Sequence, residues 1–218
     1  MALSLGVGGF FESLSLRTGF PFGRYYFTDV MGPKLFELPI LLVLAYVGMG
    51  YISWVLAMLV LGYARRPFTI ERAVALPLVA SFIMVEWDLA MDPVWANIDR
   101  AWVWKNGGAY FGVPVSNYLG WYLTVFVTYQ LFALYLRSRS RVISELTSEQ
   151  GRLAILFYAA CAGGNLLLII SDRSLRVTDG AGKQWFSTDI IGVCVIVSVF
   201  VMGSFAILAW LRAGESEI

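Results

Sequence analysis

Long apolar runs, separated by short polar segments, recur along the whole chain of 218 residues. About 20 consecutive apolar residues are enough for a helix to cross the hydrocarbon core of a bilayer. Runs of this length predict five membrane-spanning helices, at residues 38–63, 72–91, 117–137, 152–171 and 187–211. We therefore expect an all-α fold in which residues 1–218 form one polytopic transmembrane helix bundle.

Two further segments are apolar but lack the length or regularity of a span. Residues 1–20 are rich in glycine and too short for a predicted span, and they lack the basic region and cleavage site of a signal peptide. Residues 92–116 contain three tryptophans, two prolines and three glycines, which is too apolar for a solvated linker. This connection is predicted to be a re-entrant or interfacial loop, with an aromatic belt at the membrane surface as the alternative interpretation.

Arginine is concentrated in the two short connections at 64–72 and 137–152. The residues concerned are Arg65, Arg66, Arg72, Arg137, Arg139, Arg141 and Arg152. With five spans, both connections lie on the same side as the C-terminus, and short cytoplasmic loops carry an excess of Lys and Arg. We therefore expect a multi-pass protein of the cell membrane whose C-terminus is cytoplasmic.

The overall composition agrees with a membrane protein and excludes several functional classes. Hydrophobic residues make up 59% of the chain and charged residues 14%, against roughly 25% charged residues in soluble domains. The net charge of +1 gives no indication of a nucleic-acid partner. Because the chain has no histidine, we expect neither haem nor a metal site, and no other cofactor is indicated. Lys34, Lys105 and Lys183 all lie outside the apolar runs, which argues against a retinal Schiff base.

Acidic residues gather at the end of the second predicted span. Glu86 and Asp88 lie where the helix is still apolar, and an ionised carboxylate there costs at least about 2–3 kcal/mol. Two interpretations remain open for these residues: the end of a span near the lipid headgroups tolerates them, or they have a functional role. If the helix continued, Asp88, Asp92 and Trp95 would form one stripe. Pro93 disfavours helical dihedrals at the preceding residue, so the favoured interpretation makes Asp92 the N-cap of a new short helix.

Other polar residues lie at the ends of the predicted spans or inside them. Glu37 adds a carboxylate on the same side of the membrane as the 92–116 connection. Ser116 or Asn117 is expected to N-cap the third span. Asn165, which follows two glycines in the fourth span, is expected to join packed helices by hydrogen bonds.

Three blocks of sequence resemble the carotenoid biosynthesis family of membrane hydratases, which includes bisanhydrobacterioruberin hydratases and related acyclic carotenoid 1,2-hydratases. The blocks are FGRYYF at 22–27 with ELP at 37–39, EWD at 86–88 with DP at 92–93, and YFGVP at 110–114 with SNYLGW at 116–121. The third block is the most specific, and the later helices match in hydropathy only. Members usually carry more helix before the first block, so we expect this chain to be short there.

The resemblance implies addition of water across the terminal C1–C2 double bond of an acyclic, lycopene-like carotenoid, without a redox cofactor. The implied partners are this carotenoid, membrane lipid and other enzymes of carotenoid biosynthesis. Such a reaction needs a carboxylic acid that protonates the less substituted carbon, rings that stabilise the tertiary cation, and a base that accepts a proton from water. The candidate catalytic residues are Asp88, Asp92, Glu86 and Glu37, and the candidate substrate-binding residues are Trp87, Trp95, Trp102, Tyr110, Asn117, Trp121 and Tyr25.

Within this set, our hypothesis makes Asp88 the acid and either Asp92 or Glu86 the base, with Asn117 orienting water or the second carboxyl. A rigid polyene must lie largely in lipid, so we expect a lateral opening between helices. Two rival interpretations remain. A non-catalytic carotenoid-binding or scaffold subunit would pair its acids with arginines, and a transporter is disfavoured because the chain shows no inverted repeat.

Overall fold

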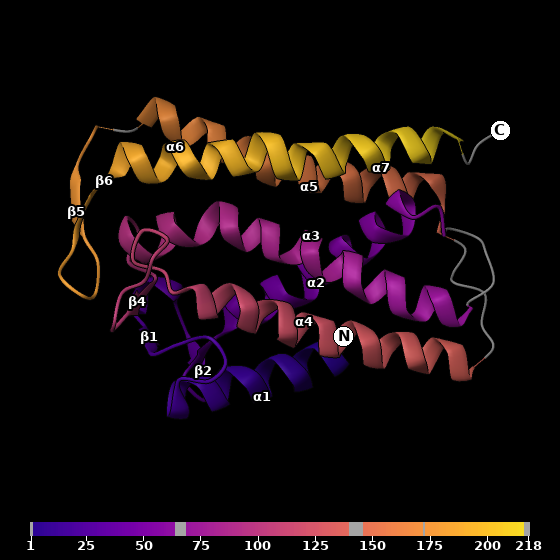
Figure 1. The fold of residues 1–218 in the computed structure, drawn as a ribbon, viewed down its shortest axis with the longest axis horizontal. Coiled ribbons are helices and arrows are strands. Elements are labelled where there is room, and N and C mark those ends of the chain that lie inside the picture. Colours follow the sequence, from indigo (N-terminus) through magenta and orange to yellow (C-terminus); the bar gives the residue numbers. More distant parts are fainter. Residues whose placement is uncertain (1, 64–68, 140–145, 172, 216–218) are drawn as a thin grey trace.

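The computed structural model describes residues 2–63, 69–139, 146–171 and 173–215. Its helices run alongside one another to form a bundle (Figure 1). They are α1 Ala2–Thr18, α2 Ile40–Val60, α3 Ile70–Asn97, α4 Val115–Ser138, α5 Ser148–Ser171, α6 Ser187–Val197 and α7 Gly203–Glu215. Helices α6 and α7 are joined without a break by a π-helical turn, η2 Ser198–Met202.

Five helices are long and apolar enough to cross a membrane, which confirms the predicted bundle. They cover Ile40–Val60, Ile70–Asn97, Val115–Ser138, Ser148–Ser171 and Ser187–Gly214. The second is 28 residues long and extends beyond the predicted span at both ends. Three arginines used to predict the orientation, Arg65, Arg66 and Arg141, lie outside the described residues.

Residues 2–18, for which no span was predicted, form helix α1 on the side of the bundle (Figure 1). This helix packs against α2 and α4. At Gly8 a side chain would lie 3.3 Å from the ring of Tyr46, so glycine allows the close approach of α1 and α2. The helix also buries a carboxyl group, that of Glu12.

Helix α3 continues through Pro93 to Asn97, so the prediction that Asp92 caps a new helix was wrong. Proline has no backbone N–H, and at position 93 it leaves the carbonyl oxygen of Leu89, one turn earlier, without its helical donor. The hydroxyl of Tyr110 donates to that oxygen at 3.2 Å. The continuous helix therefore places Asp88 and Asp92 on one face, as the alternative interpretation expected.

The expected N-cap of the third span was also wrong. Helix α4 begins after Pro114, whose backbone is extended and which makes no side-chain cap. The hydroxyl of Ser116 donates instead to the carbonyl oxygen of Phe22 at 2.9 Å, and Asn117 is turned toward α3. Both polar side chains thus join α4 to other parts of the chain.

Short strands cover the end of the bundle that lies opposite the C-terminus (Figure 1). They are β1 Tyr25–Phe27, β2 Lys34–Leu35, β3 Leu38–Pro39, β4 Trp102–Trp104, β5 Arg176–Thr178 and β6 Gln184–Phe186, with a 3-10 turn at Asp29–Met31. Each pair is antiparallel: β1 with β4, β2 with β3, and β5 with β6. Within the 92–116 connection, Trp102 and Trp104 of β4 are buried in the protein.

The β5–β6 hairpin packs on the connection that follows β4. Its turn is held by Asp179, whose carboxylate accepts hydrogen bonds from the backbone N–H of Lys183 and from the indole N–H of Trp185. A Cβ at Gly180 would lie 2.2 Å from the carbonyl oxygen of Trp104, so the two backbones are in direct contact. The hairpin thereby holds strand β4 against the bundle.

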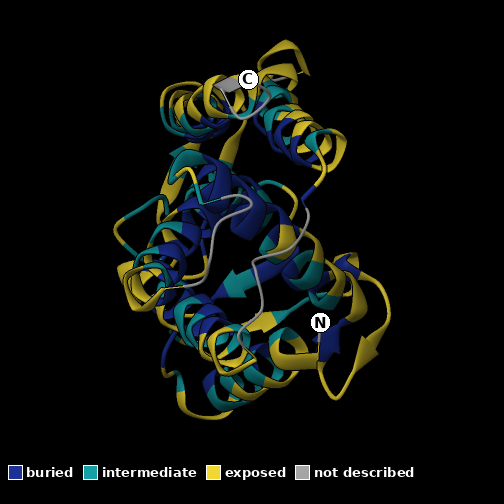
Figure 2. Ribbon diagram, turned by 90° about the vertical axis from the view of Figure 1, so that its right-hand side faces the viewer, coloured by how far each residue is buried: buried dark blue, intermediate teal, exposed yellow. Residues whose placement is uncertain are grey.

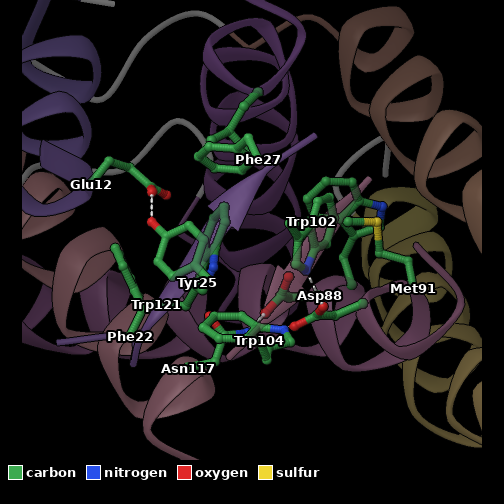
Figure 3. A pocket seen from close by; sticks show the side chains of 13 residues that line it. Glu12, Phe22, Tyr25, Phe27, Asp88, Met91, Trp102, Trp104, Asn117 and Trp121 are labelled. Atoms are coloured by element: carbon green, nitrogen blue, oxygen red, sulfur yellow. Dashed lines mark hydrogen bonds between the residues drawn. The ribbon is translucent and has the colours of Figure 1, made fainter. Parts of the chain in front are cut away.

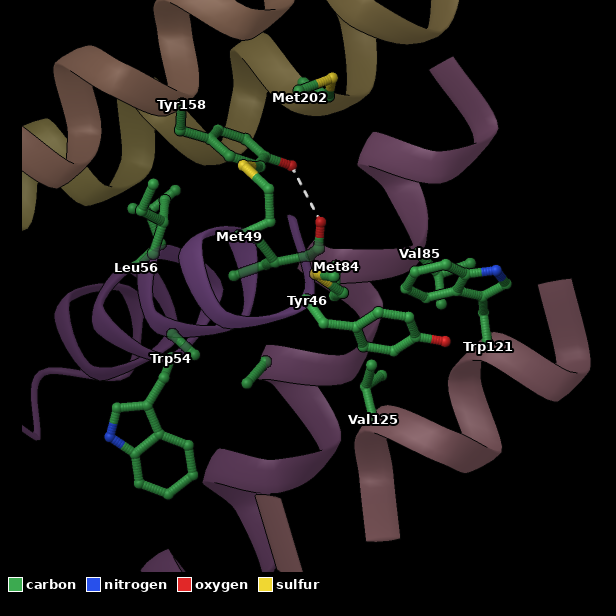
Figure 4. Close-up of a cluster of buried hydrophobic side chains, with 14 of the residues drawn as sticks. Tyr46, Met49, Trp54, Leu56, Met84, Val85, Trp121, Val125, Tyr158 and Met202 are labelled. Carbon is green, nitrogen blue, oxygen red and sulfur yellow. Dashed lines mark hydrogen bonds between the residues drawn. The ribbon is translucent and has the colours of Figure 1, made fainter. Parts of the chain in front are cut away.

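Buried residues lie between the spans (Figure 2). Many large apolar side chains of the spans are nevertheless exposed. The ring of Tyr46 on α2 stacks on that of Trp121 on α4, with centroids 4.4 Å apart (Figure 4). Tyr158 on α5 donates to the carbonyl oxygen of Ile83 on α3 at 3.1 Å. As predicted, Asn165 joins helices: it donates to the hydroxyl of Ser198 at 2.8 Å.

Replacement of Gly120 by valine should destabilise the protein by about 1–3 kcal/mol, because overpacking shifts the surrounding structure. A Cβ at Gly120 would lie 2.7 Å from the ring of Phe22 and 2.9 Å from the backbone of Pro21. Thermal unfolding in detergent measures the effect. Gly192→Val in α6 is the control, since a Cβ there meets nothing within 4 Å, and equal stability of the two variants would contradict the prediction.

Candidate active site

A pocket lies beneath the β1–β4 pair, between α1, α2, α3 and α4 (Figure 3). Its walls are Glu12, Phe22, Tyr25, Phe27, Leu42, Trp87, Asp88, Met91, Asp92, Trp102, Trp104, Asn117 and Trp121. The cavity volume is about 30 Å³. Since one water molecule needs at least about 10–15 Å³ of such space and several polar partners, the pocket has room for one or two waters.

Two carboxyl groups share one amide in this pocket. Asp88 and Asp92 are both 1% exposed and lie one turn apart on α3. The side-chain N–H₂ of Asn117, on the facing helix α4, donates to Asp88 at 3.0 Å and to Asp92 at 2.6 Å. The indole N–H of Trp102 on β4 donates to the other oxygen of Asp92 at 2.7 Å. Residues from three separate elements therefore fix the geometry of the pair.

Neither carboxyl group of this pair has a cationic partner among the described residues. The ion pair between Lys34 and Asp29 is exposed and involves no residue of the pocket wall. Asp88 and Asp92 instead receive neutral donors, from Asn117 and Trp102. This differs from the arginine-paired acids that a scaffold subunit was expected to have.

Aromatic rings form most of the remaining wall. Tyr25 lies against Trp104 with centroids 4.8 Å apart, and the two residues face each other across the β1–β4 pair. The indole N–H of Trp104 is buried beside Asp92. Ring faces carry a negative potential, so this wall suits a positively charged species.

A third carboxyl group in the wall, Glu12, was missed from the sequence. It is 4% exposed and accepts hydrogen bonds from the hydroxyls of Tyr25 and Tyr46, the latter at 2.9 Å. Burial of the Tyr25 hydroxyl raises its pKa above the usual range, and the nearby Glu12 carboxyl raises this pKa further. The hydroxyl therefore stays protonated and donates its hydrogen bond. A usable signal existed: Glu12 is the sole charged residue of the apolar stretch 1–16, and such residues call for a functional or pairing explanation.

Seven of the predicted site residues line the pocket. They are Asp88, Asp92, Trp87, Trp102, Asn117, Trp121 and Tyr25. Two others stand just behind its wall, because Trp95 stacks on Trp102 and Tyr110 reaches the backbone of Leu89.

The structure places two predicted acids away from the pocket. Glu37 is exposed in the turn between β2 and β3, where its φ is +67°. Glu86 is two residues from Asp88, which on a helix is the opposite face, and it lies toward Tyr158 of α5. One oxygen of Glu86 is buried without a hydrogen-bond partner among the described residues. The geometry therefore groups Asp88 with Asp92 rather than with Glu86.

Comparison with known proteins assigns the chain to a family. The family model described as carotenoid biosynthesis protein matches residues 1–178, so the chain belongs to the carotenoid biosynthesis protein family. It is also similar to bisanhydrobacterioruberin hydratase from Haloarcula japonica, with 30% identity over 122 residues. The aligned region covers 56% of this chain and 39% of that relative. No solved structure matches.

Proposed function

We propose that this chain is a carotenoid hydratase that adds water across the terminal C1–C2 double bond of an acyclic, lycopene-like end group. Family membership supports a role in carotenoid modification, and the similar hydratase supports this reaction type. The observation that carries the proposal is the Asp88–Asn117–Asp92 arrangement in an aromatic pocket with room for water. The reaction is redox-neutral, so the proposal includes no redox cofactor.

In the first step Asp88 donates its proton to C2. The O–H bond of the acid breaks, the π electrons form the C2–H bond, and a positive charge remains on the tertiary carbon C1. Asp88 suits this role because, among the described residues, it accepts a hydrogen bond from Asn117 alone, whereas both oxygens of Asp92 accept hydrogen bonds. Two negative charges at this spacing would repel strongly in a poorly hydrated site, so a pair that shares one proton is the stable arrangement.

The cation at C1 is then stabilised by the pocket wall. The ring faces of Tyr25 and Trp104 supply negative potential, and the carboxylate of Asp92 supplies a full charge. These groups are already in place before reaction, because β4 and α3 are joined through the Trp102–Asp92 hydrogen bond. Stabilisation of this kind costs little reorganisation when the charge develops.

Water completes the reaction by attack on C1. The C–O bond forms, one proton of the water passes to Asp92, and the product is a tertiary alcohol. Asn117 holds the two carboxyl groups side by side, so that return of this proton to Asp88 restores the starting state. We assign Asp88 and Asp92 as catalytic residues and Asn117 as the residue that positions them.

The orientation in the membrane belongs to the same proposal. We place the C-terminus and the arginine-rich connections in the cytoplasm of a cell-membrane protein, and the pocket near the opposite face. The acyclic carotenoid reaches the pocket from membrane lipid, where other enzymes of carotenoid biosynthesis release it.

Expression in a lycopene-producing host tests the proposed function. We expect extracted pigments to gain the mass of one or two water molecules when the chain is present, and to be unchanged in cells that carry an empty vector. Pigment that co-purifies with the protein at unchanged mass would contradict hydration and would support a carotenoid-binding subunit instead.

A further inference from the structure

A second cavity opens on the outside of the bundle between α2 and α5. Its volume is about 610 Å³, far larger than the 30 Å³ of the acid pocket. The walls include Leu44, Gly48 and Tyr51 of α2 and Leu153 and Phe157 of α5. We refer to this cavity as the α2–α5 groove.

The α2–α5 groove is apolar and faces the surroundings of the bundle. The side chains of Leu44, Tyr51, Leu153 and Phe157 are all more than half exposed. Because α2 and α5 both have the length and composition of membrane spans, these side chains face acyl chains. An apolar molecule can therefore enter the groove sideways from the bilayer.

One side chain, Trp87 of α3, belongs to the walls of both cavities. It directly precedes Asp88 in the sequence, and it is only half-buried. The groove and the acid pocket therefore meet at a single ring, which separates the proposed acid from the lipid-facing opening.

We infer that the α2–α5 groove binds the polyene chain of the carotenoid whose end group enters the acid pocket past Trp87. The identity of the end-group reaction rests on the proposed function, whereas the binding of a long apolar chain does not. The acid pocket has room for one or two waters, so the polyene must lie outside it. Along α2 the groove runs from Leu44 to Ile52, about 12 Å at 1.5 Å per residue, which suits a narrow, extended ligand.

Substitution of Gly48 by tryptophan tests the inference. A Cβ at Gly48 meets nothing within 4 Å, so the indole would occupy the groove instead of displacing the core. Gly164→Trp on α5 is the matched control: this glycine is exposed, its Cβ also meets nothing within 4 Å, and it is not part of the groove. Both proteins are purified from a lycopene-producing host, and bound pigment per protein is read from the polyene absorbance.

We expect Gly48→Trp to retain at most about one tenth of the wild-type pigment, a loss equivalent to about 1.4 kcal/mol of binding, and Gly164→Trp to retain all of it. Wild-type pigment content in Gly48→Trp would overturn the inference and show a surface that binds only lipid. An equal loss in both variants would overturn it as well. Elution volume and thermal unfolding verify the fold, and Gly48→Leu replaces the tryptophan variant if that protein does not fold.

A short acyclic isoprenoid with the same end group but no polyene separates this inference from the proposed function. Hydration of this compound by the wild-type protein tests the end-group reaction without the groove, because the compound has no polyene to bind there. If wild-type protein hydrates neither substrate, the proposed function fails. The pigment loss confined to Gly48→Trp would still support the groove in that case.

Discussion

Asp88→Asn is expected to abolish hydration while leaving carotenoid bound to the protein. The amide has nearly the shape of the carboxyl group but has no proton acidic enough to transfer to carbon. General acid catalysis contributes about 10²–10⁴ in rate, so the hydrated pigment should fall by at least that lower factor. Pigment masses from isolated membranes that carry equal amounts of protein give the measurement.

Asp189→Asn provides the matched control for this experiment. Asp189 is exposed in the first turn of α6, away from the pocket, so its variant should hydrate at the wild-type rate. The single variant Asp92→Asn should also lose hydration activity, because the attacking water then has no base beside it. Full hydration by the Asp88→Asn protein would remove this residue as the acid.

Asn117→Leu should lower both stability and activity, because it removes the donor that Asp88 and Asp92 share. A buried acceptor left without a partner costs about 1–3 kcal/mol, more if charged. We also expect hydration per folded protein to fall by about 10²-fold or more, since misplacement of a reacting group by about 1 Å has that effect. Thermal unfolding and pigment mass are measured on the same preparation.

The control for Asn117→Leu is Asn165→Leu, which removes another amide inside the spans, one that is partly buried. Asn165 bonds Ser198 and the backbone of Ala90, and it has no contact with the acid pocket. Its variant should lose stability but keep its hydration rate per folded protein. If the two variants lost activity in proportion to stability alone, Asn117 would be a packing residue rather than a positioning residue.

The spans were predictable because a run of about 20 apolar residues is stable mainly as a helix that crosses a bilayer. Helix α1 was missed because its 17 residues fall short of that length and several of them are glycine. What holds it in place is contact with α2 and α4, including the approach at Gly8. Such non-local contacts leave no periodic signal in the sequence.

The site was predictable in its residue types more than in its geometry. Asp88 and Asp92 were singled out because carboxyl groups are costly in a span, and the structure brings them together on Asn117. Glu86 satisfied the same criterion, yet helix rotation turns it toward α5. Whether Asp92 caps a new helix or lies inside α3 depended on whether α3 continues through Pro93. The hydroxyl of Tyr110, which is distant in sequence, supports the continuous helix by donating to the backbone carbonyl that Pro93 leaves without a donor.

The pairing of β1 with β4 also has a consequence for the biogenesis of this protein. Tyr25 pairs with Trp104, so the first strand leaves the ribosome while its partner is still unmade and both α2 and α3 lie between them. At about 5–20 residues per second, that interval lasts on the order of ten seconds. The pocket therefore comes into being in one late event, once the second and third spans have both inserted in the correct direction. In a chain whose second span is inserted in the wrong direction, the pocket would not form. Bound pigment would therefore indicate that the spans are correctly inserted.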